Sequence, residues 1–318
     1  KKTEWLATHN IEDLVYVYNP PGGWLQNCNS TPFTAAGPYS PRRGDYLPYM
    51  APDAENFRGL NAVRILSMKK KYSMQDLIDV GYDRHLVAFD SLLPSLHNAY
   101  YSDENLRQEQ AVNEAMGLLD SWDRNVDINS VALTVAIHLG EKLLPFIAAV
   151  PKTPVEGFVE QMHTYLQRTD AKILINALHE TLLELNARYG TWKIPWGDIN
   201  RFQRLDNNRV ASFNDSLSSY AVPYVSSTWG MLPAFASRRY AGTAKRYGWG
   251  GNSFICVVDF GPRVKAKSLL AGGESGDPAS PHFFDQAGLY ATGKFRDVFF
   301  YKEDVKANAN ITYHPGDK

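Results

Sequence analysis

The sequence predicts an α+β protein with a helical middle and strands towards both ends. Over residues 53–190, apolar side chains recur every three or four positions, which is the spacing of an amphipathic helix. Residues 14–18 and 254–260 are short runs rich in β-branched and aromatic side chains, and turn residues bound them. We expect the strands of the two ends to share a sheet. Because these strands are few and short, we also expect the chain to complete a larger sheet.

Four segments of different composition follow one another along residues 1–318, which we treat as one structural unit. Residues 1–52 are rich in Pro, Gly, Asn and Tyr and predict strand and loop, whereas residues 53–190 are predicted to be helical. Residues 191–252 lose the helical period and are predicted to be irregular. Residues 253–318 carry the terminal strands, which we place at Phe254–Phe260, in a second run to Leu270, and at Val298–Tyr301.

Local signals indicate where some helices begin and end. Ser73, followed three residues later by Asp76, has the pattern of a capping box at the start of a helix. Pro94 is expected to kink or end the helix that carries Leu92 and Leu96. Asp103 is expected to cap the next helix.

Two further stretches have a helical pattern. The run 131–149 is apolar nearly all round, which predicts a buried helix. Residues 171–189 are amphipathic and are expected to stop near Gly190. No apolar run is predicted to span a bilayer.

The composition excludes several functional classes. A formal net charge of -1, with only short basic clusters, does not favour nucleic acid or an anionic membrane as a partner. The two cysteines, Cys28 and Cys256, have no metal-ligand spacing, and no pair of histidines has it either, so no metal site is predicted. The first five residues lack the apolar core of a signal peptide.

The most informative stretch is residues 19–33, NPPGGWLQNCNSTPF. Its two prolines and two glycines predict a tight turn, and Trp24 gives a short apolar anchor. Asn27 and Asn29 lie two positions apart, so they share one face if the segment is extended. A side-chain amide is a neutral donor that can stabilise an oxyanion. By physical chemistry alone, amides that satisfy nearby backbone groups in a loop are the favoured interpretation.

This stretch resembles the motif Asn-Pro-x-x-Gly-aromatic-x-x-Asn-x-Asn-x-x-Pro of the penicillin acylase family, which comprises N-terminal-nucleophile hydrolases. Four later elements resemble family elements in the same order. They are Asn56-Phe57-Arg58, the helix end at residues 119–123 (LDSWD), residues 196–201 (WGDINR), and residues 272–286 (GGESGDPASPHFFDQ). Five ordered elements are far more specific than any one of them.

The resemblance implies that the chain is the C-terminal part of a β-subunit with part of the αββα N-terminal-nucleophile hydrolase fold. It implies that Asn29 donates to the oxyanion hole. The nucleophile, a Ser with a free α-amine that serves as base, is expected to lie outside this chain. The resemblance also implies that Arg58 lies near Asn29 and this amine, where its charge would lower the pKa of the amine. We weigh that position equally against an ion pair with Asp53 or Glu55.

Other matched residues carry less functional information. Trp24 is a candidate wall of the acyl pocket, although a packing anchor is the favoured interpretation. Asn200 stands where the family has a His, so no imidazole role is carried over. His282 is interpreted as a structural residue that ties its loop to the core. A self-contained hydrolase that uses His282 and Asp285 is disfavoured.

The function implied by the resemblance is hydrolysis of N-acyl amides, namely β-lactam antibiotic side chains, N-acyl-homoserine lactones or acyl-peptides. The alternative is a relative that only binds or packs. The implied partners are the rest of the β-subunit and the α-subunit of the same precursor. No cofactor is expected to be required, and the ligands of any structural Ca²⁺ would lie mostly outside this chain. The implied location is periplasmic or secreted.

Overall fold

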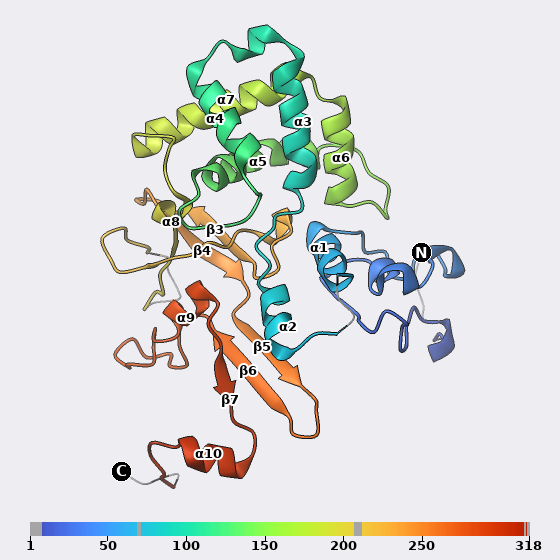
Figure 1. The fold of residues 1–318 in the computed structure, drawn as a ribbon, viewed down its shortest axis with the longest axis vertical. Coiled ribbons are helices and arrows are strands. Elements are labelled where there is room, and N and C mark those ends of the chain that lie inside the picture. The colour runs from blue at the N-terminus through green and yellow to red at the C-terminus, as the bar shows by residue number, and fades with distance from the viewer. Residues whose placement is uncertain (1–7, 69–70, 207–211, 315, 317–318) are drawn as a thin grey trace, which may run out of the picture.

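The chain forms a layer of helices above two small β-sheets, and an N-terminal segment lies to one side (Figure 1). The computed structural model describes residues 8–68, 71–206, 212–314 and 316. The helices of this part are α1 (Phe57–Leu66), α2 (Met74–Gly81), α3 (Phe89–Ser102), α4 (Gln110–Ser121), α5 (Val131–Ala148), α6 (Phe158–Arg168), α7 (Ala171–Tyr189), α8 (Trp196–Ile199), α9 (Ala287–Thr292) and α10 (Lys302–Asn308). Single 3-10 turns occupy Ile11–Asp13, Pro32–Thr34, Gly37–Tyr39, Arg43–Asp45, Glu104–Arg107 and Ser227–Trp229.

Helix α5 lies at the centre of the helical layer and packs against α4, α6 and α7. Its side chains are buried on most sides, as its apolar sequence predicts. By length and composition α5 could cross a membrane, so the prediction that no run is long enough for this is wrong. However, 56% of its span is buried inside the protein. The apolar residues of α5 therefore form the core of the helical layer.

The strands form two separate sheets below α3 to α7, whereas α2 and α9 lie beside the sheets and α10 lies below them (Figure 1). The first sheet has the order β2-β1-β4-β3, from β1 (Asn200–Phe202), β2 (Tyr220–Ala221), β3 (Phe235–Arg239) and β4 (Arg246–Gly251). Strands β1 and β4 are parallel and the other pairs are antiparallel. The second sheet is antiparallel with the order β5-β6-β7, from β5 (Phe254–Asp259), β6 (Lys265–Leu270) and β7 (Arg296–Val298).

The α+β class is confirmed, and several element predictions are confirmed as well. The capping box of Ser73 and Asp76 opens α2. Helix α7 ends at Gly190, whose φ of 78° lets it adopt the left-handed conformation that ends many helices. Strands β5 and β6 lie in the two runs, Phe254–Phe260 and the following run to Leu270, that the sequence predicts as strands.

Other element predictions are wrong. Residues 14–18 are extended but unpaired, so the described N-terminal residues add no strand to either sheet. Helix α3 does not end at Pro94, since buried leucines on both sides of it pack into the core, and a kink there stays a prediction. Asp103 caps a 3-10 turn, and α4 begins only at Gln110.

The last two corrections concern strands. The segment 191–252, predicted to be irregular, contains α8 and β1 to β4. Strands β1 and β2 have too few residues to show a period, and the glycines of β4 interrupt its pattern. The last strand ends at Val298 rather than at Tyr301, since Tyr301 caps helix α10.

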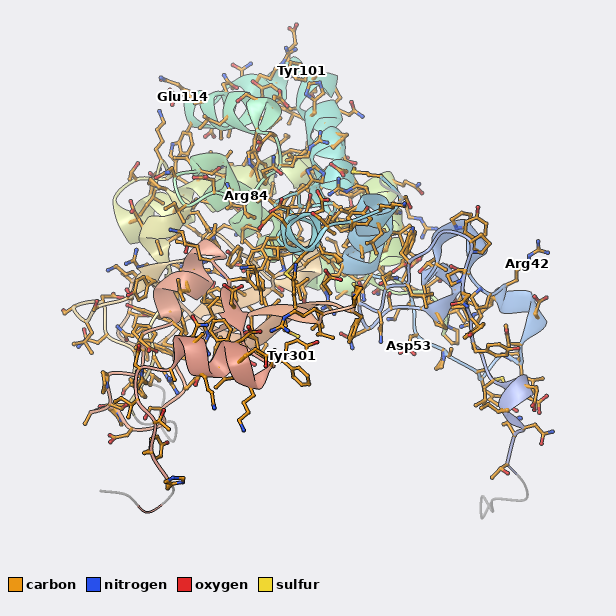
Figure 2. All side chains as sticks on the ribbon, turned by 60° about the horizontal axis from the view of Figure 1, so that its bottom comes forward. Arg42, Asp53, Arg84, Tyr101, Glu114 and Tyr301 are labelled. Atoms are coloured by element: carbon orange, nitrogen blue, oxygen red, sulfur yellow. The ribbon has the colours of Figure 1, made fainter. Side chains whose placement is uncertain are left out.

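Residues 8–56 form an irregular segment beside α1, which we call the N-terminal segment (Figures 1 and 2). In Figure 2, Arg42 marks its outer part and Asp53 lies closer to the body of the molecule. Several large apolar side chains in this segment are exposed to solvent: Ile11, Leu14, Tyr16, Tyr18, Leu25, Tyr39, Leu47 and Tyr49. Large apolar residues are thus exposed along the whole N-terminal segment, and this chain does not cover them.

Candidate functional site

The candidate site is the bend at residues 28–30, which lies against the first turn of α1. Asn29 has a φ of 54°, a left-handed conformation that Asn tolerates better than most residues. Its backbone N–H donates to Oδ1 of Asn27 over 2.9 Å. Asn27 therefore has the structural role that the sequence indicates for it: its amide oxygen closes the turn that leads into Asn29.

Arg58 holds Asn29 from the start of α1. Its Nη2 donates to Oδ1 of Asn29 and to the backbone carbonyl of Cys28, each over 2.8 Å. Neither Asp53 nor Glu55 forms an ion pair with Arg58 among the interactions of the described residues. The two carboxylate oxygens of Glu55 accept instead from the N–H of Asn56 and from Oγ1 of Thr34. Of the two positions considered for Arg58, the structure has the one beside Asn29.

The contact with Arg58 determines which way the Asn29 amide faces. Since its oxygen accepts from the guanidinium, its NH₂ group points the other way. No acceptor in the described part of the chain takes a hydrogen bond from this NH₂, and the side chain is exposed. A charged donor on the oxygen also polarises the amide and makes the free N–H a stronger donor. The site thus offers one oriented, neutral hydrogen-bond donor.

Trp24 packs inside the N-terminal segment rather than in the main core. A Cβ added to Gly37 would lie 3.2 Å from the Trp24 ring, and one added to Gly22 would lie 3.5 Å from its Nε1. The ring is half-buried against these two backbone turns. This is the packing of a local anchor, and a role in an acyl pocket stays a prediction.

Cys28 precedes Asn29 but has no feature of a nucleophile. It is a free cysteine, and burial raises the pKa of its thiol, although the charge of Arg58 acts in the opposite direction. A raised pKa keeps the thiol neutral at physiological pH, and the thiolate is the reactive form. Cys28 therefore contributes its backbone carbonyl to the site rather than its sulfur.

The residues at the other matched elements lie in structural roles. Asn200 is fully buried, and its Nδ2 donates to the carbonyls of Val222 at 2.7 Å and Tyr224 at 3.1 Å. Among the contacts of the described residues, the His282 side chain bonds to Asp285 over 2.9 Å within its own exposed loop, so the interpretation that it ties this loop to the core is wrong. Its carbonyl accepts from the N–H of Ser275. Trp122 ends α4 and donates to the carbonyl of Asn125.

Within the described residues, no group of three or more His, Cys, Asp and Glu side chains could hold a metal ion. Sequence reasoning missed a different feature of the site, the side chain of Asn56. It is the N-cap of α1, and its Oδ1 accepts from the N–H of Gly59. An Asn directly before the first helical residue is a capping signal, so this role could have been found.

The fold and the sequence can now be compared with known proteins. A solved structure, a thermostable penicillin G acylase from Alcaligenes faecalis, matches 99% of this chain with a TM-score of 0.52 and 16% sequence identity. This likeness defines the fold: the chain has an α+β fold similar to part of that acylase chain. The chain spans 60% of the length of that acylase chain. The family model for penicillin amidase matches residues 1–307, and the chain therefore belongs to the penicillin amidase family.

Proposed function

We propose that the protein completed by this chain hydrolyses the amide bond of N-acyl compounds. In this proposal, the attacking group is an N-terminal Ser outside the 318 residues, and Asn29 supplies a donor to the oxyanion hole. Family membership supports amide hydrolysis in general. The observation that carries the assignment of Asn29 is its geometry, since Arg58 holds the amide oxygen and leaves the NH₂ group free.

The chemistry asked of Asn29 is stabilisation of charge. When the Ser oxygen attacks the substrate carbonyl, the carbonyl oxygen becomes an oxyanion, and an oriented N–H stabilises it more than it stabilises the ground state. The amine then leaves with a proton, and water releases the acyl group from the Ser ester. The Arg58 charge near the α-amine would disfavour its ammonium form and keep it available as a base.

The proposed substrate has an apolar acyl chain, as in β-lactam antibiotic side chains, N-acyl-homoserine lactones or acyl-peptides. Trp24 is proposed to border the acyl pocket. We propose no cofactor for the chemistry, and a structural Ca²⁺ would take most of its ligands from elsewhere in the protein. A periplasmic or secreted location is proposed from the family.

The proposed partners are the rest of the β-subunit and the α-subunit from the same precursor. The exposed apolar residues of the N-terminal segment support this proposal, because they belong to the same segment as Asn29 and this chain leaves them uncovered. An interface that covered them would also exclude water from Asn29, which strengthens a hydrogen bond to an oxyanion.

The test replaces Asn29 by Gly in the assembled enzyme, because Gly adopts a positive φ without strain. Loss of one oxyanion donor typically costs about 2.7–4 kcal/mol in the barrier, so we expect kcat to fall by about 100- to 1000-fold with little change in KM. Asn98→Ala is the matched control, since Asn98 is exposed on α3 in the helical layer. A wild-type kcat for Asn29→Gly would rule out the proposed role.

The second candidate is a relative that binds or packs without catalysis. It is motivated by the lack of an assigned nucleophile in this chain. Intact mass and N-terminal sequencing of the purified protein address it directly. A second chain that begins with Ser, together with acyl-amide hydrolysis abolished by Ser→Ala, supports the enzyme, whereas binding of N-acyl amides without turnover supports the alternative.

A further inference from the structure

We propose that Asn56 is a positioning residue for the oxyanion donor: its side-chain amide fixes the backbone of Asn29 and so aims the Asn29 NH₂ group. The inference rests on the proposed function and adds to it a residue that has no contact with the reacting atoms. It comes from the hydrogen bonds that the first turn of α1 makes to residues 28–30.

The Nδ2 group of Asn56 donates to two consecutive backbone carbonyls. The carbonyl of Cys28 lies 3.0 Å away and that of Asn29 lies 3.1 Å away. These two carbonyls belong to the peptide groups on either side of the Asn29 Cα. Holding both of them fixes the φ and ψ angles of Asn29, and with them the direction in which its side chain leaves the backbone.

Arg58 and Asn56 hold different parts of Asn29. Arg58 holds the side-chain oxygen of Asn29, and Asn56 holds its backbone on both sides. They meet at the carbonyl of Cys28, which accepts from both residues. A carbonyl has two lone pairs, so both bonds are possible at once. Neither contact is sufficient alone, because an amide whose oxygen is held can still move if its backbone is free.

Asn56 is itself held in place by neighbouring residues. Its own N–H donates to Oε1 of Glu55 over 2.8 Å, and Oε2 of Glu55 accepts from Thr34 over 2.5 Å. A Cβ added to Gly59 would lie 2.2 Å from Oε1 of Glu55 and 2.7 Å from Oγ of Ser30. The start of α1 and residues 30–34 thus interlock closely, and Gly at position 59 permits this approach.

Asn56 also caps α1 through its Oδ1, which accepts from the N–H of Gly59 over 2.9 Å. A residue that only capped the helix would affect stability alone. The two tasks use different atoms of the side chain, so a substitution can separate them. Asn56→Ser keeps an oxygen acceptor for the cap and removes the NH₂ donor, and Ser is about as good an N-cap as Asn.

The experiment measures kcat, KM and the unfolding temperature of the assembled enzyme with Asn56→Ser. We expect kcat to fall by about 10- to 100-fold, since a displacement of about 1 Å in an active site can cost this much, with KM and the unfolding temperature little changed. The matched control is Asp170→Ala, which removes the N-cap of α7. Helix α7 is not part of the candidate site. This control variant should lower the unfolding temperature and leave kcat unchanged.

A double-mutant cycle with Asn29→Gly shows whether Asn56 acts through Asn29. We expect Asn56→Ser to have no further effect on kcat once the Asn29 amide is gone. An unchanged kcat in the single Asn56→Ser variant would overturn the inference while the role of Asn29 stands. So would an equal fall in both backgrounds. A wild-type kcat for Asn29→Gly would instead overturn the role of Asn29 as oxyanion donor, and this inference with it.

Discussion

The N-terminal segment, residues 8–56, and the helical layer, formed by α1 and α3 to α7, are held together by different interactions. In the helical layer, apolar side chains from α1 and α3 to α7 are buried in one continuous core. In the N-terminal segment, Ala36 is the only apolar side chain of the described residues that is fully buried. The bend at Asn29 is held instead by hydrogen bonds from Asn56 and Arg58. Stability of the chain and geometry of the candidate site should therefore respond to different substitutions.

The largest expected effect on stability is in the helical core. Phe89 is fully buried, and its ring lies 5.6 Å from that of Trp122 and 5.3 Å from that of Trp229. We expect Phe89→Ala to lower the free energy of unfolding by about 3–5 kcal/mol in denaturant titrations of the chain. The control is Phe146→Ala in α5, because Phe146 is 57% exposed. Equal losses for the two variants would contradict the position of the core.

A smaller effect is expected where the two regions meet, at Gly59. Its missing Cβ leaves room for Glu55 and Ser30, so Gly59→Ala forces one of them to move. We expect a loss of about 1–3 kcal/mol of stability, together with a lower kcat in the assembled enzyme. In Gly117→Ala, the same change in α4, the added Cβ meets nothing within 4 Å. That variant should gain up to about 1 kcal/mol from helix propensity. A gain in stability from both substitutions would show that Glu55 and Ser30 do not pack closely against position 59.

The helical layer should also have a pH dependence that arises from a buried histidine. Burial, together with the nearby Arg246 charge, lowers the pKa of His138 to about 4. Below pH 6.5 the unfolded chain binds a proton at this residue and the folded chain does not, so stability falls as the pH drops from about 6.5 to about 4. The slope from this group is at most about 1.4 kcal/mol per pH unit.

Two variants test this pH dependence. His138→Gln should flatten the dependence of unfolding free energy on pH, and Asn98→Ala on the exposed side of α3 should not, because it removes no ionisable group. An unchanged slope for His138→Gln would mean that another group causes the acid sensitivity.

The smallest effect is expected for exposed apolar residues of the N-terminal segment. Leu25 is 52% exposed, so Leu25→Ser should change the unfolding free energy of the chain by no more than about 0.5 kcal/mol. If the proposed partner covers this residue, the same variant should weaken assembly of the subunits, which analytical ultracentrifugation of the mixed chains can measure. Loss of stability in the isolated chain would show that Leu25 is part of a core.

The difference between the two regions also explains what could be predicted from the sequence. Helices α5 and α7 were predictable, since each buries an apolar surface with a helical period inside this chain. The extended residues 14–18 have the β-branched and aromatic side chains of a strand, but a strand also needs a neighbour to pair with. Strands β1 and β2 were missed because they have only three and two residues and because β1 pairs with a strand distant in sequence, as Asn200 does with Arg246. Strand β4 was missed because three of its six residues are glycines, which do not signal a strand.

The site was predictable only in part. The motif gave Asn29, and the start of a helix near Arg58 was visible from the apolar period that follows it. No pattern in one sequence shows that this helix end meets the bend at residues 28–30 across a loop of more than 20 residues. Asn56 can hold the backbone of Asn29 only because the helix start lies against this bend. The sequence therefore indicates its role as N-cap, and only the structure shows its hydrogen bonds to residues 28 and 29.

The second sheet has a practical consequence for anyone who purifies this chain. Strands β5 and β7 are its two edges within the described residues, and each leaves a row of backbone N–H and C=O groups unpaired. On β5, Phe254 is 59% exposed and Cys256 carries a free thiol at the surface. An uncovered apolar edge is a template for strand addition between molecules. Concentrated, oxidising solutions of the isolated chain should thus favour aggregation, with cross-links through Cys256.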